Sequence, residues 1–284
     1  MRHSIAQRVL GVLTLGAALA ACGDTEPAGP AEHAHVGLAH IHGLAVNPAD
    51  GELYAGSHNG VFVVTGKSEP EQVAGRTQDF MGFTIIGPDH FLGSGHPGPD
   101  ASGQPPHLGL IESTDGGETW RSLSLSGEAD FHAMEAKHDT VYGFDSQTGK
   151  LLVSKDMRSW DQRAALPMAD FAVSPDDADE LLATTQDGVV RSTDGGRSFA
   201  TDDAGPVLLL LDWASTKQLV GITPDGQVRT SADGGESWRE AGSVPGSPQA
   251  ITWHPDSGIY VATDQAIHRS TDDGATFDVY QQLG

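Results

Sequence analysis

Short apolar stretches alternate with polar turns along most of this 284-residue chain. From His40 onward each stretch ends at Gly, Asp, Asn or Pro, and none continues into the stripe of an amphipathic helix. The pattern predicts an all-β protein built from six similar units of four short strands. We expect first strands to begin near His40, Phe80, Phe131, Phe171, Leu208 and Gln249, and second strands near Leu53, Phe91, Val141, Leu181, Leu219 and Ile259.

An eight-residue phrase follows the third predicted strand of most units. Ser-Thr-Asp-Gly-Gly-Glu-Thr-Trp occupies 113–120 and returns at 192–199, 231–238 and 270–277, with an altered copy at 154–160. The leading serines are 41, 38, 39 and 39 residues apart, a period typical of repeat architectures. A short carboxylate beside glycines can accept N–H bonds in a tight turn, so each copy predicts a hairpin corner. The structural aspartates would be Asp115, Asp194, Asp233 and Asp272.

The phrase resembles the Asp-box, or BNR repeat, of sialidase-like and glycosyl-hydrolase-like β-propellers. That family's pattern is Ser/Thr-x-Asp-x-Gly-x-Thr/Ser-Trp/Phe, and its role there is structural. About 244 residues in units of roughly 40 give four short strands a unit. The resemblance and the period together predict a six-bladed β-propeller over residues 40–284. A seventh blade would need a unit that the sequence does not show.

The first 39 residues are predicted to export and anchor the protein. Arg2 and Arg8 precede an apolar run, 9–20, that is too short to span a bilayer. Leu19-Ala20-Ala21-Cys22 resembles the bacterial lipobox, which implies a lipoprotein signal peptide at 1–21 and a lipid on Cys22. Residues 22–39 would then form a flexible tether. We expect a bacterial envelope protein, at the outer face of the cytoplasmic membrane or in the periplasm.

Net charge narrows the range of partners. The chain has 39 acidic and 16 basic residues, and removing 1–21 takes away two arginines, which changes the charge from −23 to −25. Such a surface repels nucleic acid and anionic lipid, so we expect membrane contact through the lipid alone. Cys22 is the only cysteine, so no disulfide forms within the chain. We expect a monomer and leave open an envelope protein as partner.

The candidate chemistry comes from aligning the inner strands of the first three units. His42, Met81 and His132 occupy the same second position. In a propeller, the start of strand one, the loop between strands two and three, and the start of strand three share one face. The other side chains expected on this face, beside the channel mouth, are His40, His58, His96 and His107.

Imidazole and thioether together suit copper, whereas imidazoles alone would also suit zinc. The predicted function is therefore binding, delivery or sequestration of a transition metal, with copper first and zinc as the alternative. Binding should weaken as pH falls through about 6.5, because ligating imidazoles must be neutral. Asp79, Asp130 and Asp170 are either supporting partners of the imidazoles or turn residues. We interpret four other histidines as ordinary polar residues: His90, His138, His254 and His268.

Two alternatives remain open. The family resemblance implies a glycoside hydrolase or glycan-binding protein, in which Glu135 and Asp145 could form a carboxylate pair. Sialidase activity itself is not expected, because that chemistry is taken to need three arginines around the channel, and no arginine begins a predicted inner strand. The third function considered is a protein-binding scaffold, as in the Asp-box assembly factors of photosystem II and the sortilin receptors.

Overall fold

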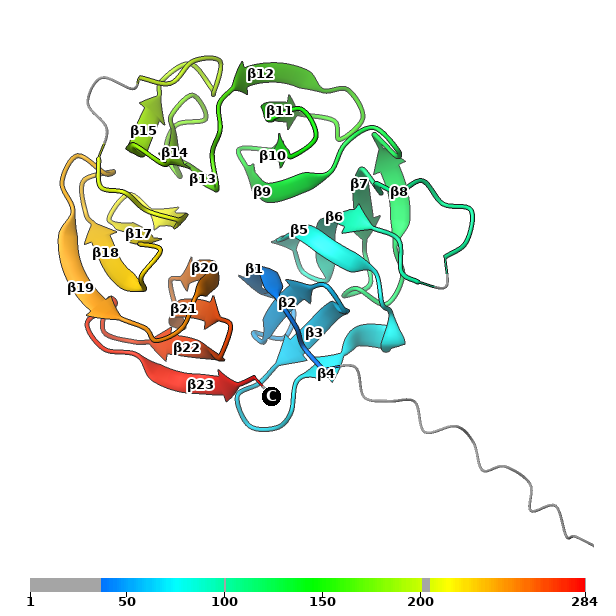
Figure 1. The fold of residues 1–284 in the computed structure, drawn as a ribbon, viewed down its shortest axis with the longest axis horizontal. Coiled ribbons are helices and arrows are strands. Elements are labelled where there is room, and N and C mark those ends of the chain that lie inside the picture. Colours follow the sequence, from blue (N-terminus) through cyan, green and yellow to red (C-terminus); the bar gives the residue numbers. More distant parts are fainter. Residues whose placement is uncertain (1–36, 100, 201–204, 284) are drawn as a thin grey trace, which may run out of the picture. The chain divides into compact units, whose positions relative to one another are not determined.

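The computed structural model describes residues 37–99, 101–200 and 205–283, and this part of the chain forms a six-bladed β-propeller. Six antiparallel sheets stand around a central channel, with the first strand of each sheet innermost (Figure 1). The six blades follow one another in chain order, as the repeat period predicted. Within the described residues no helix is long and apolar enough to cross a membrane.

Blades one to three each contain four strands, and blade one is followed by a short 3-10 helix, η1 (Val73–Gly75). Blade one contains β1 (Ile41–Val46), β2 (Leu53–Ser57), β3 (Gly60–Val64) and β4 (Glu71–Gln72). Blade two contains β5 (Asp79–Gly87), β6 (His90–His96), β7 (Leu110–Ser113) and β8 (Arg121–Ser124). Blade three contains β9 (Phe131–Lys137), β10 (Thr140–Asp145), β11 (Lys150–Ser154) and β12 (Asp161–Ala165).

Blade four differs from the others in its outer edge. Among its described residues, which exclude 201–204, it contains three strands, and a single bridge between Arg191 and Ala200 stands where a fourth strand was expected. Its strands are β13 (Phe171–Val173), β14 (Leu181–Thr185) and β15 (Gly188–Ser192). Blade five contains β16 (Leu210–Ser215), β17 (Gln218–Ile222), β18 (Gln227–Ser231) and β19 (Arg239–Ser243). Blade six contains β20 (Pro248–His254), β21 (Gly258–Thr263), β22 (Ala266–Ser270) and β23 (Asp278–Gln282).

The second strand of each blade lies in the core, and a glycine in it often makes room for a large inner side chain. In β10, a Cβ on Gly143 would lie 2.6 Å from the ring of Phe131, which is fully buried. In β6, a Cβ on Gly93 would lie 2.7 Å from the ring of Phe80. The glycine therefore lets an aromatic side chain from the inner strand cross over the sheet and fill the interior of the blade.

The repeated phrase forms the hydrogen-bonded corner that its residues predict. In the copy at 113–120, Ser113 Oγ donates to Asp115 Oδ1 at 2.7 Å and accepts from Gly117 N at 2.8 Å. Thr119 N also donates to Asp115 Oδ1, at 2.9 Å. These bonds hold the pKa of the exposed Asp115 carboxyl below its usual range, the Thr119 bonds first. The copies led by Ser192, Ser231 and Ser270 make the same set of bonds.

The ring closes without exchange of a strand between the first and last blades. All four strands of the first sheet come from the N-terminal part of the described chain, and all four strands of the last sheet come from its C-terminal part. One buried cluster joins Ile41 and Phe62 of blade one to Tyr260 and Ile267 of blade six. The side-chain oxygen of Gln249 also accepts a 2.9 Å bond from Ile41 N. Side-chain packing and this bond therefore complete the circle.

Side chains also connect most neighbouring inner strands. An inner strand is the edge of its sheet, and its outward N–H groups have no strand to pair with. In the described part of the chain, a polar side chain of the preceding blade accepts one such N–H at five of the six junctions. The pairs are Ser94 with Phe131 N, Glu135 with Val173 N, Asp170 with Leu211 N, Asp212 with Trp253 N, and Gln249 with Ile41 N.

Candidate functional site

In four blades the innermost strand has a β-bulge near its first residues, and these bulges lie at one end of the channel. The pairing register shifts around His42 in β1, Met81 in β5, His132 in β9 and Gln249 in β20. A bulge leaves one residue without a partner and redirects its side chain. Three of these side chains, those of His42, His132 and Gln249, line a cavity of about 430 Å³ inside the ring. His42, Met81 and His132 thus occupy equivalent bulge positions in their strands, as the alignment of the inner strands predicted.

A first group of three imidazoles stands at this mouth. The ring centroids of His40, His42 and His58 lie 4.6 to 4.9 Å apart, and the ring of His58 stacks on both others. One ring nitrogen of each lies within 4.8 Å of the other two. His40 reaches this position with a φ of 45°, a left-handed conformation that is strained for a residue other than glycine.

Burial keeps the central imidazole of this first group neutral. Burial first, and then the neighbouring His40 and His58, lower the pKa of His42 to about 3. Burial also lowers the pKa of His40, with His58 as the second cause. His42 Nε2 is buried and has no hydrogen-bond partner in the described structure. Neutral imidazoles with a free nitrogen are the form that a metal ion requires.

A second group is built from His96, His107 and Asp130, again with one ligand atom from each within 4.8 Å of the others. Asp130 Oδ2 lies 3.5 Å from His96 Nε2, 3.8 Å from His107 Nδ1 and 3.0 Å from His132 Nε2. Burial alone would raise the pKa of Asp130, but the hydrogen bond and charge of His132 and the charge of His96 outweigh it and hold the pKa low. Asp130 is therefore a carboxylate among imidazoles.

Asp79 lies between the two groups. Its Oδ1 is 3.9 Å from His58 Nε2, and its Oδ2 is 3.2 Å from His96 Nδ1. The sequence alone is compatible with Asp79 and Asp130 being either partners of the imidazoles or turn residues, and the structure places both carboxylates among the rings. The signal that could have found them is the Asp-Phe pair that opens the inner strands, at 79–80 and again at 130–131.

The structure therefore gathers the six predicted histidines at one end of the channel. For Met81 the structure gives the equivalent bulge position in β5. The four histidines that were interpreted as ordinary polar residues are elsewhere: His90 Nε2 lies 2.7 Å from Glu112, and His138 Nε2 lies 2.8 Å from the carbonyl of Ser174. His268 lies in β22, and His254 lines the channel at the last residue of β20. Cys22, with the predicted signal peptide and most of the tether, lies outside the described residues.

The proposed pair of Glu135 and Asp145 does not fit a catalytic arrangement. Asp145 pairs with Phe131 at the start of β9, and Glu135 lies four residues further along that strand, or about 13 Å. Glycosidase pairs lie about 5 to 9.5 Å apart. Asp145 is also buried, and its oxygens accept bonds from Asp130 N, Gln147 N and Thr148 Oγ1. It is a structural residue that holds the backbone of Asp130.

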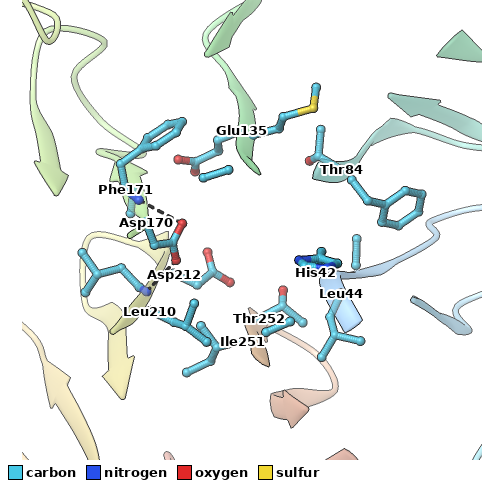
Figure 2. Close-up of a pocket in the computed structure, with 18 of the residues that line it drawn as sticks. His42, Leu44, Thr84, Glu135, Asp170, Phe171, Leu210, Asp212, Ile251 and Thr252 are labelled. Atoms are coloured by element: carbon cyan, nitrogen blue, oxygen red, sulfur yellow. Dashed lines mark hydrogen bonds between the residues drawn. The ribbon is translucent and has the colours of Figure 1, made fainter. Parts of the chain in front are cut away.

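The middle of the channel carries three half-buried carboxyl groups. Figure 2 shows Glu135, Asp170 and Asp212 along the wall of the cavity, across from His42. Burial raises the pKa of all three, to about 7 for Asp170. Lys137 pairs with Glu135 and donates to the carbonyls of Val173 and Trp213. The described lining of this cavity includes no arginine.

No family model and no curated protein matches the sequence. Among solved structures, the chain is similar to the GH74 xyloglucanase from Xanthomonas campestris, with a TM-score of 0.54 and 17% identity over 86% of this chain and 38% of that one. It therefore spans well under half the length of the xyloglucanase.

Two further solved structures match over most of both chains. YCF48 bound to D1 peptide gives a TM-score of 0.51 and 17% identity over 86% of this chain and 83% of that one. Virginiamycin B lyase from Staphylococcus aureus gives a TM-score of 0.54 and 13% identity over 85% of this chain and 84% of that one. At such identities the similarity shows the fold alone, and that fold is the β-propeller.

Proposed function

We propose that this protein binds a transition metal, with copper first and zinc as the alternative, at the channel mouth. The observation that carries the proposal is the stack of His40, His42 and His58. Three imidazoles from two segments of blade one converge there, and the buried Nε2 of His42 has no partner in the described structure. Burying a polar nitrogen without a partner costs on the order of 1–3 kcal/mol, and a metal ion would remove that cost.

Copper is preferred because of the residue types at the bulge positions. Three imidazoles can hold either copper or zinc, while a thioether favours copper. Met81 occupies in β5 the position that His42 occupies in β1, so it is the thioether candidate. A role in binding, delivery or sequestration follows, since the stacked groups are ligands rather than a nucleophile with its base.

The cellular setting is part of the same proposal. The signal at 1–21 and the lipobox cysteine, Cys22, would place the propeller at the outer face of the cytoplasmic membrane or in the periplasm, anchored by lipid. The repeated phrases would be Asp-boxes of the sialidase-like superfamily. The protein would be a monomer whose acidic surface attracts metal ions and repels nucleic acid. An envelope protein would be the partner that receives the metal.

The test is the metal content of protein purified without a histidine tag. We call the stack of His40, His42 and His58 the first site. We expect bound copper or zinc in the wild type and loss of the metal from this site in the variant His40→Ala/His42→Ala/His58→Ala. His254→Ala is the matched control, because it removes an imidazole from the other end of the same channel. Equal metal affinity in the triple variant and the control would refute the proposal.

A scaffold function is the second candidate. YCF48 is a propeller of similar size that was solved with a bound peptide, and this chain covers 83% of it. Capture of a specific envelope protein by metal-free material, unaffected by the triple histidine variant, would favour this alternative over metal binding. The hydrolase alternative loses its proposed carboxylate pair, because Asp145 serves the fold.

A further inference from the structure

The second group at the channel mouth has its own unpartnered atoms. His107 Nδ1 and Asp130 Oδ1 are both buried without a hydrogen-bond partner in the described structure. Asp130 is only 2% exposed, and a buried carboxylate normally has both oxygens satisfied. The oxygen that does have partners faces three imidazoles at 3.0 to 3.8 Å. Imidazole nitrogens and a carboxylate oxygen that converge on one point are the ligand atoms of a typical metal site.

The spacing of these atoms suits an ion between them. Ligands at 2.0–2.1 Å from a tetrahedral ion lie about 3.3 Å from one another. The ligand atoms of His96, His107 and Asp130 lie within 4.8 Å of each other, so shifts of about 1 Å close the group around an ion. His132 Nε2, at 3.0 Å from Asp130 Oδ2, is the available fourth ligand.

The surrounding backbone holds these ligands in place. The N–H of Asp130 is fixed by Asp145 Oδ1 at 3.0 Å. Between His96 and His107 the chain makes a Gly- and Pro-rich excursion, and the 2.8 Å bond from Leu108 N to Gly95 O closes it. Gly95 has a φ of 142°, and a Cβ there would clash with a backbone carbonyl oxygen in β5. Only glycine permits this close approach, which brings His96 against the start of β5.

We propose that His96, His107 and Asp130, with His132 as fourth ligand, form a second metal site, distinct from the imidazole stack, for a divalent ion of the zinc class. The mixed nitrogen and oxygen donors suit zinc, whereas the ligand atoms of the first site are all imidazole nitrogens. The two sites share no ligand, so the second does not depend on an ion in the first. Asp79 connects them, since its two oxygens face one ring of each group.

The competing explanation is an ion pair. If His132 were protonated, its 3.0 Å contact with Asp130 would be a charge-assisted bond that needs no metal. An ion pair predicts no stoichiometric uptake of zinc by this group. It also leaves His107 Nδ1 unpartnered, as in the described structure. Counting the ions bound by each group separates the two explanations.

The experiment is a titration of the metal-free full chain with zinc, repeated with cobalt(II), whose visible absorption reports tetrahedral nitrogen and oxygen ligands. We expect two ions per wild-type chain. His107→Ala should lose one ion and keep the other, and His40→Ala/His58→Ala should lose the other one. His138→Ala, outside both groups, should bind two. Asp79→Asn should weaken the second ion by about 10-fold, the usual effect of removing a carboxylate behind a ligand.

Each outcome supports or overturns the second site. An ion count in His107→Ala that equals the wild-type count would overturn it. Loss from His107→Ala with no loss from His40→Ala/His58→Ala would keep the second site and refute the first. Asp130→Asn provides a second removal from the same group, and urea unfolding of both variants shows whether the propeller is intact. A folded Asp130→Asn protein that still binds two ions would also overturn the proposal.

Discussion

The half-buried carboxyl group of Asp170 is expected to make the stability of the propeller depend on pH. Its oxygens accept 2.9 Å bonds from Phe171 N and Leu211 N, the second of which belongs to the next blade. Burial, with smaller contributions from Glu135 and Asp212, nevertheless raises its pKa from 3.8 to about 7. Between these two values the folded protein holds a proton that the unfolded chain has lost. The free energy of unfolding therefore falls as pH rises through this window.

The size of the effect follows from the two pKa values. With 3.8 in the unfolded chain and about 7 in the folded protein, Asp170 should lower the stability by about 2–3 kcal/mol between pH 5 and pH 8. Asp170→Asn does not titrate, but its amide can accept only one of the two N–H bonds. Losing the other costs about 1–3 kcal/mol at every pH. The variant should be less stable than the wild type at pH 5 and should recover about 2–3 kcal/mol relative to it by pH 8.

Urea unfolding of metal-free protein at pH 5 and pH 8 measures this difference. Asp278→Asn is the matched control, because Asp278 is exposed at the start of β23 and the same substitution there should leave the pH dependence of the wild type unchanged. Parallel pH dependence in Asp170→Asn and the wild type would show that the Asp170 carboxyl does not hold its proton in the folded state. The reasoning from burial would then be refuted.

Three further outcomes are expected. Metal binding at the first site should persist below the pH of about 6.5 expected for ordinary imidazoles, because burial lowers the pKa of His42 to about 3; copper competition titrations at pH 7 and pH 5 check this. Gln249→Leu should destabilise the ring by about 1–3 kcal/mol in urea unfolding, since Ile41 N loses its acceptor, and an unchanged midpoint would contradict the role given to this junction. Ser231→Ala should cost about 1–3 kcal/mol and lower the thermal midpoint, because it removes the hydroxyl at the centre of its hairpin corner; Ser126→Ala, at an exposed position, is the control and should leave the midpoint unchanged.

The sequence carried enough local information to predict the fold. Hydrophobic alternation, glycine turns and the repeated phrase are local properties, and each blade repeats them within about 40 residues. The strands β2 (Leu53–Ser57) and β14 (Leu181–Thr185) begin where the apolar pattern placed them. The predicted fourth strand of blade four is a single bridge in the described residues, because a local pattern does not measure whether an outer strand finds a partner to pair with.

The candidate site was predicted in part. Aligning the inner strands placed His42 and His132 at one mouth, because equivalent positions in a propeller share an end of the channel. The sequence pattern does not distinguish Asp79 and Asp130 from turn residues, and it offers Asp145 only in an alternative carboxylate pair, from which the structure separates it by its position in β10. In each case the deciding contact joins residues of different segments, such as the 3.2 Å approach of Asp79 to His96.

The amino-acid sequence by itself thus determined the strands, their repetition and the face to which the histidines belong, since these follow from neighbours along the chain. Only the tertiary structure decided that the imidazoles divide into two groups joined by Asp79, and that the pKa of Asp170 is raised to about 7. Burial and the distances between side chains of different blades control both outcomes, and both quantities exist only once the ring has closed.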